Sequence, residues 1–389
     1  MKRLNTLVVA AVSLVGLASC QKETQSVNKN DDGIMGMTQN NNTNARVSEG
    51  TGQGAVYLLD NATVSNHVLV YDRSVNGELS ANGSFATGGT GTGAGLGSQG
   101  AVILDNGNQY LFAVNAGSND ISSFRINGNG LTWVDKIASG GTTPISLTLN
   151  DGVIYVLNAG GTGNIHGFRV DQGHFMSIGG STQSLSSGAA GPAEVQFNNE
   201  GTALVVTEKN TNTVDVFPVN NGVAGARVSY PSTGITPFGF AFDKNDQFFV
   251  SDAYGGMTGQ SALTSYSLND LGQLAVLSGP VGTTQTSACW VAVTGNGKYA
   301  YTANTGSATI SGYSINSNGE VSLLDPSGVS GNTGMSPADL ALSNNSHFLY
   351  SRNGASNSIS LFEVQSSGAL INIGTVTGLP RGSAGLAAK

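Results

Sequence analysis

Carboxylate side chains near the ends of expected strands are the groups in this sequence that could carry acid–base chemistry. Glu194 lies two residues after Pro192, and Glu208 ends the next expected strand, with Lys209 directly behind it. A carboxylate gathered with others can have a raised pKa and act as a general acid or base. We therefore predict Glu194 and Glu208 as candidate catalytic residues. The alternative is that such carboxylates only line a polar channel.

Further polar and aromatic side chains occupy corresponding places in other parts of the chain and could bind a ligand. A cation among them could stabilise a negatively charged oxygen that develops during a reaction. Three of the four histidines are expected in outer strands or after an outer turn, and His347 is expected at the start of a second strand, so all four are expected to be surface or packing residues. The predicted binding residues are Trp290, Asp339, Asp252, Arg352 and Lys209.

One sequence unit recurs seven times and provides the strands that would position these side chains. Each unit has a short apolar strand ending in a polar residue, then a turn, then an aliphatic residue followed three positions later by an aromatic one, as in Ile121 with Phe124. Hairpin signals such as Asn127-Gly128 separate further strands. Four antiparallel strands per unit, repeated seven times, predict an all-β seven-bladed β-propeller. The polar strand ends are Asp60, Asn115, Asn158, Glu208, Asp252, Asn304 and Asn353.

The loops that enter the innermost strands should share one face of the propeller with the loops that leave the second strands. Proline begins four of the innermost strands, at 144, 192, 237 and 337. Because functional residues concentrate on loops held by a rigid scaffold, we expect the site on this face. The position two residues after the proline should line the mouth of the channel, and in the seven units it is Ala101, Ser146, Glu194, Gly239, Trp290, Asp339 and Ser383.

The two ends of the chain predict how the ring closes. The first unit, beginning at Val56, has no innermost strand ahead of it, whereas a surplus strand follows Pro380. We expect this C-terminal strand to become the innermost strand of the first blade, with Ala384 and Leu386 where Leu147 and Leu149 lie in another blade. Such an exchange removes exposed sheet edges.

The segment around Pro192 carries a family resemblance. Gly191-Pro192-Ala193-Glu194-Val195-Gln196-Phe197 and the strand that ends at Glu208 resemble the repeat of the seven-bladed lactonase family, which includes 6-phosphogluconolactonase-type and carboxymuconate-cyclase-type propellers. The resemblance extends over essentially the whole domain. It implies that Glu208 matches an acidic residue of active-looking members, which carry Arg-His where this chain has Ala193-Glu194.

Two classes of function remain open after this departure. The missing Arg-His pair favours a binding or scaffold module that uses the channel face. The alternative is a divergent lactonase-type hydrolase or cyclase acting on a sugar-derived or carboxylated lactone. The repeat specifies packing, so it distinguishes folds better than it distinguishes chemistries.

Two segments resemble a cofactor motif and a metal motif, but the neighbouring sequence does not fit either site. The segment 95–100, Gly-Leu-Gly-Ser-Gln-Gly, has dinucleotide-like spacing but precedes a strand instead of a helix. The segment 243–246 resembles half a calcium loop but has no downstream glutamate. We therefore expect no cofactor and no bound metal.

The beginning of the chain is typical of an exported lipoprotein. Lys2 and Arg3 precede an apolar run over residues 7–17, and Leu17-Ala18-Ser19-Cys20 resembles a lipobox. We predict a signal peptide over residues 1–20, lipid attachment at Cys20, a disordered tether over 21–54 and the propeller over 55–389. The alternative is a cleaved signal with an incidental cysteine. Residues 21–23 lack the aspartate of inner-membrane retention, which indicates an outer-membrane lipoprotein of the cell envelope and leaves its side open.

Charge limits the partners of this protein. The 24 acidic residues outnumber 16 basic ones, for a net charge of −8. Nucleic-acid binding needs a basic surface, so no nucleic acid is expected. The expected partners are the membrane, through the lipid, and an unknown small molecule, glycan or protein on the channel face of a monomer.

Overall fold

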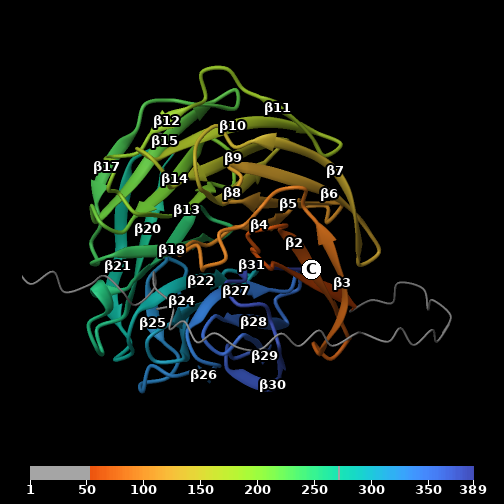
Figure 1. The fold of residues 1–389 in the computed structure, drawn as a ribbon. Coiled ribbons are helices and arrows are strands. Elements are labelled where there is room, and N and C mark those ends of the chain that lie inside the picture. Colours follow the sequence, from red (N-terminus) through yellow and green to blue (C-terminus); the bar gives the residue numbers. More distant parts are fainter. Residues whose placement is uncertain (1–52, 270–271) are drawn as a thin grey trace, which may run out of the picture.

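Short apolar runs separated by tight turns fold this chain into a ring of antiparallel sheets (Figure 1). The computed structural model describes residues 53–269 and 272–389. The described residues form seven blades of four main antiparallel strands, which follow one another in the sequence in six blades and include the C-terminal strand in the first. This confirms the predicted seven-bladed β-propeller. The predicted signal peptide, the lipid-bearing Cys20 and nearly all of the tether lie outside the described residues.

The strands are assigned from the central channel outward. The innermost strands are β31 (Ala384–Ala388), β4 (Val102–Leu104), β8 (Pro144–Asn150), β13 (Pro192–Phe197), β18 (Pro237–Phe242), β22 (Ala288–Val293) and β27 (Pro337–Leu342). The second strands are β1 (Gly54–Leu59), β5 (Tyr110–Asn115), β9 (Val153–Asn158), β14 (Ala203–Glu208), β19 (Gln247–Asp252), β23 (Tyr299–Asn304) and β28 (Phe348–Asn353).

The outer half of each blade is less regular than the inner half. The third strands are β2 (His67–Arg73), β6 (Asp120–Asn127), β10 (Asn164–Asp171), β15 (Thr213–Asn220), β20 (Ala262–Leu268), β24 (Thr309–Ile315) and β29 (Ser358–Val364). The outermost strands are β3 (Leu79–Ala86), β7 (Gly130–Ala138), β11 (His174–Ser177), β16 (Val223–Ala224), β21 (Leu274–Gly282), β25 (Val321–Leu323) and β30 (Leu370–Thr377). Short additional pieces are β12 (Gln183–Ser184), β17 (Val228–Pro231), β26 (Gly331–Asn332) and a 3-10 turn at Tyr254–Gly256.

Burial explains the difference between the strands of a blade. The second strands β9 and β14 are buried at all six positions because neighbouring sheets cover both of their faces. The outermost strand β7 instead mixes exposed and half-buried positions. The core therefore lies between adjacent blades, where repeat aromatics such as Phe124, Phe217 and Tyr313 are fully buried. No helix in the described part of the chain is long and apolar enough to cross a membrane.

The C-terminal strand closes the ring, as predicted. β31 pairs antiparallel with β1, so the first and last segments of the described chain share one sheet. Its register differs from the prediction, because Leu59 pairs with Ala384 and Tyr57 pairs with Ala387. An irregularity between these pairs accommodates one additional residue. The residue of β31 that corresponds in register to Glu194 is consequently Ala384 and not Ser383.

Candidate functional site

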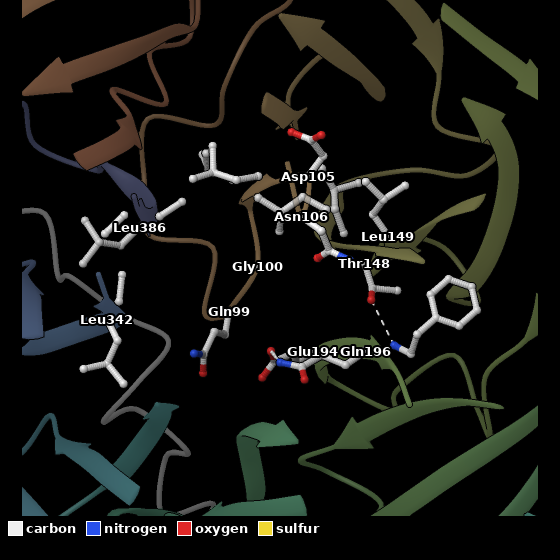
Figure 2. A pocket seen from close by; sticks show the side chains of 18 of the residues that line it. Gln99, Gly100, Asp105, Asn106, Thr148, Leu149, Glu194, Gln196, Leu342 and Leu386 are labelled. Carbon is white, nitrogen blue, oxygen red and sulfur yellow. Dashed lines mark hydrogen bonds between the residues drawn. The ribbon is translucent and has the colours of Figure 1, made fainter. Parts of the chain in front are cut away.

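The central channel holds a cavity of about 570 Å³ that opens on one face of the ring (Figure 2). We call this the hairpin face, because its rim is formed by turns between innermost and second strands at residues 105–108, 150, 198–199 and 344. Leu342 and Leu386 lie on one side of the cavity, and Thr148 and Leu149 lie on the other. The sequence predicts the site on the opposite face. We call that face the proline face, because its loops lead into the proline-bearing strands. The described cavity therefore lies at the other end of the channel.

A loop closes the channel toward the proline face. Gln99, in the loop between β3 and β4, reaches the innermost strand β22, where its Nε2 donates to Val291 O at 2.7 Å and its Oε1 accepts from Val291 N at 3.0 Å. The backbone N–H of Gln99 also donates to Ala193 O of β13. One buried side chain thus bonds the open edge of a strand 192 residues away in the sequence. Gln99 and Gly100 line this end of the cavity, and no described residue from the other loops of the proline face lines it, so we call the cavity blind.

We call residues 94–100 of this loop, which include Gln99, the plug. Other residues of the plug also bond to neighbouring blades. Ser98 Oγ donates to Ile145 O at 2.7 Å, and Leu147 N donates to Gly100 O at 2.8 Å. Gly100 has a φ of +79°, and a Cβ there would lie 2.9 Å from Ser146 Oγ. Only glycine fits this approach without strain. Gly100, the last glycine of the dinucleotide-like segment, is therefore needed to pack this loop into the channel.

Glu194 is engaged by the neighbouring blade. Its Oε2 accepts from Phe240 N of β18 at 2.7 Å, and its Oε1 accepts from Gln196 Nε2 at 2.5 Å. Gln196 Nε2 also donates to Phe240 O at 2.9 Å, so the two side chains together cap both backbone groups of Phe240. Burial raises the pKa of Glu194 well above its usual value, and nearby Asp339 raises it further. Glu194 lines the end of the cavity, but both of its oxygens already accept hydrogen bonds.

Glu208 lies outside the cavity lining and is bonded within its own part of the fold. Its carboxylate accepts hydrogen bonds from the N–H and hydroxyl of Ser186 and from the hydroxyls of Thr211 and Thr213. Burial alone would raise its pKa, but hydrogen bonds from Asp215 and from these groups lower it. Asp215 in turn has its pKa raised to about 7 by burial and by its proximity to Glu208. The proximity of the two carboxyls thus favours the ionised form of Glu208 and the protonated form of Asp215. The side chain of Glu208 does not line the cavity that Glu194 lines.

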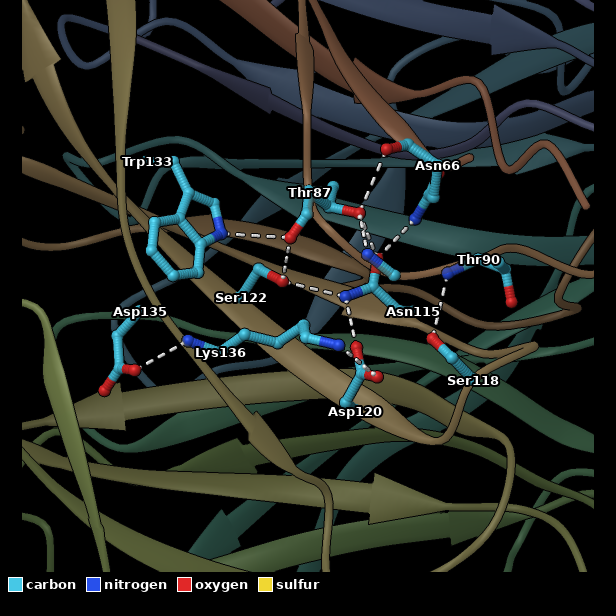
Figure 3. Close-up of polar contacts among 11 residues, drawn as sticks. Asn66, Thr87, Thr90, Asn115, Ser118, Asp120, Ser122, Trp133, Asp135 and Lys136 are labelled. Atoms are coloured by element: carbon cyan, nitrogen blue, oxygen red, sulfur yellow. Dashed lines mark hydrogen bonds and ion pairs between the residues drawn. The ribbon is translucent and has the colours of Figure 1, made fainter. Parts of the chain in front are cut away.

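The polar residues at other second-strand ends also form hydrogen bonds to the start of the next strand, as Figure 3 shows for Asn115. Asn115 donates to Asp120 Oδ1 at 2.6 Å and to Ser122 Oγ at 2.8 Å, and it accepts from Asn66 and Thr87 of the preceding blade. Each strand end thus anchors the start of its own third strand and, in this blade, the neighbouring loop. The same bonds recur at Asn304 with Thr309 and Ser311, and at Asn353 with Ser358 and Ser360.

Asp252 belongs to this set of strand ends and points into its own blade. It is fully buried, and it accepts a hydrogen bond from Thr264 Oγ1 at 2.6 Å. Burial raises its pKa to about 8. Burial therefore favours the neutral carboxylic acid form of Asp252, in a place where four other blades have asparagine.

The remaining predicted residues gather beneath the proline face. Lys209 Nζ donates to Gly97 O of the plug at 2.8 Å and lies 4.5 Å from the ring centre of Phe238. Burial lowers its pKa to about 7. The Phe238 ring also packs edge-on against Trp290, with 4.9 Å between ring centres. The predicted lysine and tryptophan thus meet at one phenylalanine, but the plug lies over the lysine.

Asp339 and Arg352 form a separate charged contact. Burial raises the pKa of Asp339 to about 7, whereas the Arg352 guanidinium and the N–H of Leu340 lower it. Leu340 N donates to Asp339 Oδ1 at 2.9 Å, and Arg352 Nη2 donates to Ala338 O at 2.9 Å. Asp339 lies close enough to Glu194 for its negative charge to raise the pKa of Glu194. In the described residues no three His, Cys, Asp or Glu side chains are grouped as metal ligands would be.

The groups required for hydrolysis can be compared with the arrangement of the predicted residues. Hydrolysis needs a base free to accept a proton from water and a donor aimed at the oxyanion. The predicted acids and bases are instead bonded to backbone and neighbouring side chains. Sequence reasoning missed Gln99, Gln196 and the asparagines of the cavity rim. Their only signal was the recurrence of Asn in the turns after the innermost strands.

The fold and the channel define the class of this protein as a seven-bladed β-propeller. A family model for the lactonase seven-bladed β-propeller matches residues 53–176, which span the first three blades up to β11. This match confirms the resemblance to that family stated from the sequence. No curated protein sequence matches the chain.

Solved structures extend the likeness to the whole ring. A candidate 6-phosphogluconolactonase from Bacteroides uniformis is 15% identical, with a TM-score of 0.66 over 86% of this chain and 99% of that one. A second candidate 6-phosphogluconolactonase, from Bacteroides fragilis, is 17% identical, with a TM-score of 0.64 over 88% and 99%. The periplasmic gluconolactonase of Pseudomonas aeruginosa is 16% identical, with a TM-score of 0.65 over 85% and 98%. At these identities the likeness establishes the fold alone.

Proposed function

We propose that this lactonase-like propeller is a non-catalytic binding module of the cell envelope that takes its ligand in the blind cavity. The observation that carries the proposal is the state of Glu194, the one predicted catalytic residue that lines the cavity. Its two oxygens are occupied by Phe240 N and Gln196 Nε2, and the cavity lining contains no Lys, Arg or His. A lactone bound there would find no cation to stabilise an oxyanion.

A divergent lactonase-type hydrolase or cyclase is the second candidate function. It is supported by the family match over residues 53–176 and by the names of the structural neighbours. In that case Glu194, a buried carboxylic acid with a raised pKa, would act as a general acid at the end of the cavity. Glu208 would have to leave its partners Ser186 and Thr211 to take part.

A lactone-hydrolysis panel separates the two functions. We expect no turnover above the spontaneous rate on gluconolactone, 6-phosphogluconolactone or a carboxylated muconolactone, because no free base faces the cavity. The measurement is proton release at constant pH, with Glu194→Gln and Glu208→Gln beside the wild type. Glu320→Gln, on the exposed turn before β25, is the matched control. Turnover by wild type and control that Glu194→Gln or Glu208→Gln abolishes would establish the hydrolase instead.

We also propose that the propeller is held at the outer membrane through Cys20. The support is the sequence Leu17-Ala18-Ser19-Cys20 behind a short apolar run, without an aspartate after the cysteine. Such an anchor would hold the propeller through a segment of about thirty residues ahead of β1. It places the module in the cell envelope, where exogenous small molecules and glycans are present.

Substitution of the lipobox cysteine tests this location. Cys20→Ala should move the protein from the membrane fraction to the soluble fraction without lowering its melting temperature, because the lipid attaches well ahead of the first strand at Gly54. Separation of membranes by centrifugation, followed by immunoblotting and a thermal melt, measures both quantities. A Cys20→Ala protein that stays in the membrane pellet would exclude the lipobox.

A further inference from the structure

The geometry points to the class of ligand: we infer that the cavity on the hairpin face binds a neutral, hydroxyl-rich small molecule such as an unphosphorylated saccharide. The inference rests on the proposed binding function and adds that phosphorylated and carboxylated ligands are rejected. Three properties of the cavity support it: its charge, its polar rim and its closed end.

The charge of the lining opposes anionic ligands. The ionisable side chains among the residues that line the cavity are Asp105 and Glu194, and both are acids. Phosphate and carboxylate sites in proteins use arginine, lysine or free N–H groups. Neither predicted cation lines the cavity: Lys209 is bonded to Gly97 O of the plug, and Arg352 is bonded to Ala338 O. An anion entering the cavity would lose its water and meet the carboxylate of Asp105 without a compensating cation.

The rim provides hydrogen-bond donors and acceptors without charge. Asn106 and Asn108 belong to the β4–β5 turn, and Asn344 belongs to the β27–β28 turn. Within residues 53–269 and 272–389, the side-chain amides of these three asparagines make no hydrogen bond of their own. By contrast, Asn150 and Asn199, also on the rim, donate to backbone carbonyls. A carboxamide both donates and accepts, as a hydroxyl does, so the three unused amides suit vicinal hydroxyl groups.

The closed end and the aliphatic walls restrict the size and shape of the ligand. Gln99 is bonded on both amide atoms to Val291 and lines the inner end of the cavity, which favours a small ligand over a polymer threaded through the channel. A volume of about 570 Å³ lies in the usual range for small-molecule sites. Leu149, Leu342 and Leu386 provide apolar wall between the polar groups, which suits the C–H faces of a sugar ring.

The experiment is a binding titration of the soluble Cys20→Ala protein with defined probes. Glucose, N-acetylglucosamine and maltotriose are the neutral probes, and glucose 6-phosphate and gluconate are their anionic counterparts. Isothermal titration calorimetry should detect at least one neutral saccharide at concentrations up to about 10 mM, the range of weak sites. Glucose 6-phosphate and gluconate should bind at least about tenfold more weakly, a difference of about 1.4 kcal/mol.

Two exposed asparagines make a matched pair of variants. Asn344→Lys places a cation on the cavity rim, whereas Asn318→Lys makes the same change on the exposed outer turn before β25. Asn344→Lys should raise the affinity for glucose 6-phosphate at least about fivefold, and Asn318→Lys should not. Asn106→Ala should weaken binding of the neutral saccharide about fivefold, as expected for the loss of one hydrogen bond.

Three outcomes would overturn the inference. In the first, the anionic probes bind the wild type with the same affinity as the neutral probes. In the second, Asn344→Lys leaves the affinity for glucose 6-phosphate unchanged. In the third, no neutral probe binds. None of these decides the proposed function, because catalysis is tested separately by lactone turnover. A protein that hydrolyses lactones and also binds neutral saccharides would contradict the proposed function and support the inference.

Discussion

Deleting residues 382–389 should abolish the folded state or lower the melting temperature by more than about 10 °C. This deletion removes β31, the innermost strand of the first blade. It breaks the paired bonds between Ala55 and Lys389, the bond from Arg73 Nε to Lys389 O and the pairing of Val56 with Ala388. All residues of β1 from Gly54 to Leu59 are buried, so their freed backbone groups would face the opened channel.

The expected loss is large because unpaired buried groups are costly. Each buried donor or acceptor left without a partner costs about 1–3 kcal/mol, whereas a whole domain is stable by about 5–15 kcal/mol. β31 also contacts the innermost strands β4 and β27 on either side. Leu386 and Ala388 pack in a core cluster with Val56 and Tyr350, which would lose apolar contacts as well.

The matched control is removal of eight residues ahead of β1, over residues 44–51, where the sequence predicts a tether. This variant should melt at the temperature of the wild type in differential scanning calorimetry. A synthetic peptide of residues 380–389 should restore part of the stability of the C-terminal truncation, since it supplies the missing strand. Equal melting temperatures for the two truncations would mean that the C-terminal strand does not hold the ring closed.

The architecture could be predicted because it depends on a repeated local pattern. The aliphatic–aromatic pair and the polar strand end recur in every blade, and ring closure follows from one missing and one surplus strand. The function of the polar strand ends could also have been recognised from spacing. Asn304, Thr309 and Ser311 repeat the offsets of five and seven residues found at Asn353. Glu208 has Thr213 and Asp215 at these offsets, so the same pattern indicated a structural glutamate.

The position of the cavity could not be predicted from such local patterns. It depends on Gln99, which bonds Val291 in a strand 192 residues later, and nothing in the segment 94–100 specifies that partner. The register of β31 was misjudged for a similar reason. One additional residue near Gly385, which has a φ of +70°, shifts Leu386 relative to the other innermost strands.

Raising the pH from 5 to 7 should destabilise this protein, in contrast to the usual behaviour of acidic proteins. Burial raises the pKa of Asp252 to about 8 and raises those of Asp215 and Asp339 to about 7. In the unfolded chain these aspartates have pKa values near 3.9, so they lose their protons below pH 5. Between pH 5 and 7 the folded protein therefore holds protons that the unfolded chain has released.

The sign and size of the effect follow from this difference. Stability falls with pH wherever the folded state binds more protons than the unfolded state, by about 1.4 kcal/mol per pH unit for each proton retained. The contribution of each buried aspartate is fully present below pH 3.9 and is lost as the pH rises through its folded pKa. Lys209, with its pKa lowered to about 7, is charged in both states below that pH and acts in the opposite direction only above it.

Asp252→Asn should reduce this pH dependence. The amide keeps an oxygen acceptor for Thr264 Oγ1, does not titrate, and is the residue found at the corresponding strand end in four other blades. Urea unfolding at pH 5, 6 and 7 should give a slope that is shallower by about 1.4 kcal/mol per pH unit than that of the wild type, with the variant the more stable protein at pH 7. Asp325, which lies in a turn after β25 and is not buried, is the matched control. Its pKa is lowered by hydrogen bonds from Ser327, so it is ionised throughout this range and Asp325→Asn should leave the slope unchanged. A slope for Asp252→Asn equal to that of the wild type would show that Asp252 is already ionised in the folded protein at pH 5, and would exclude a neutral carboxyl at this strand end.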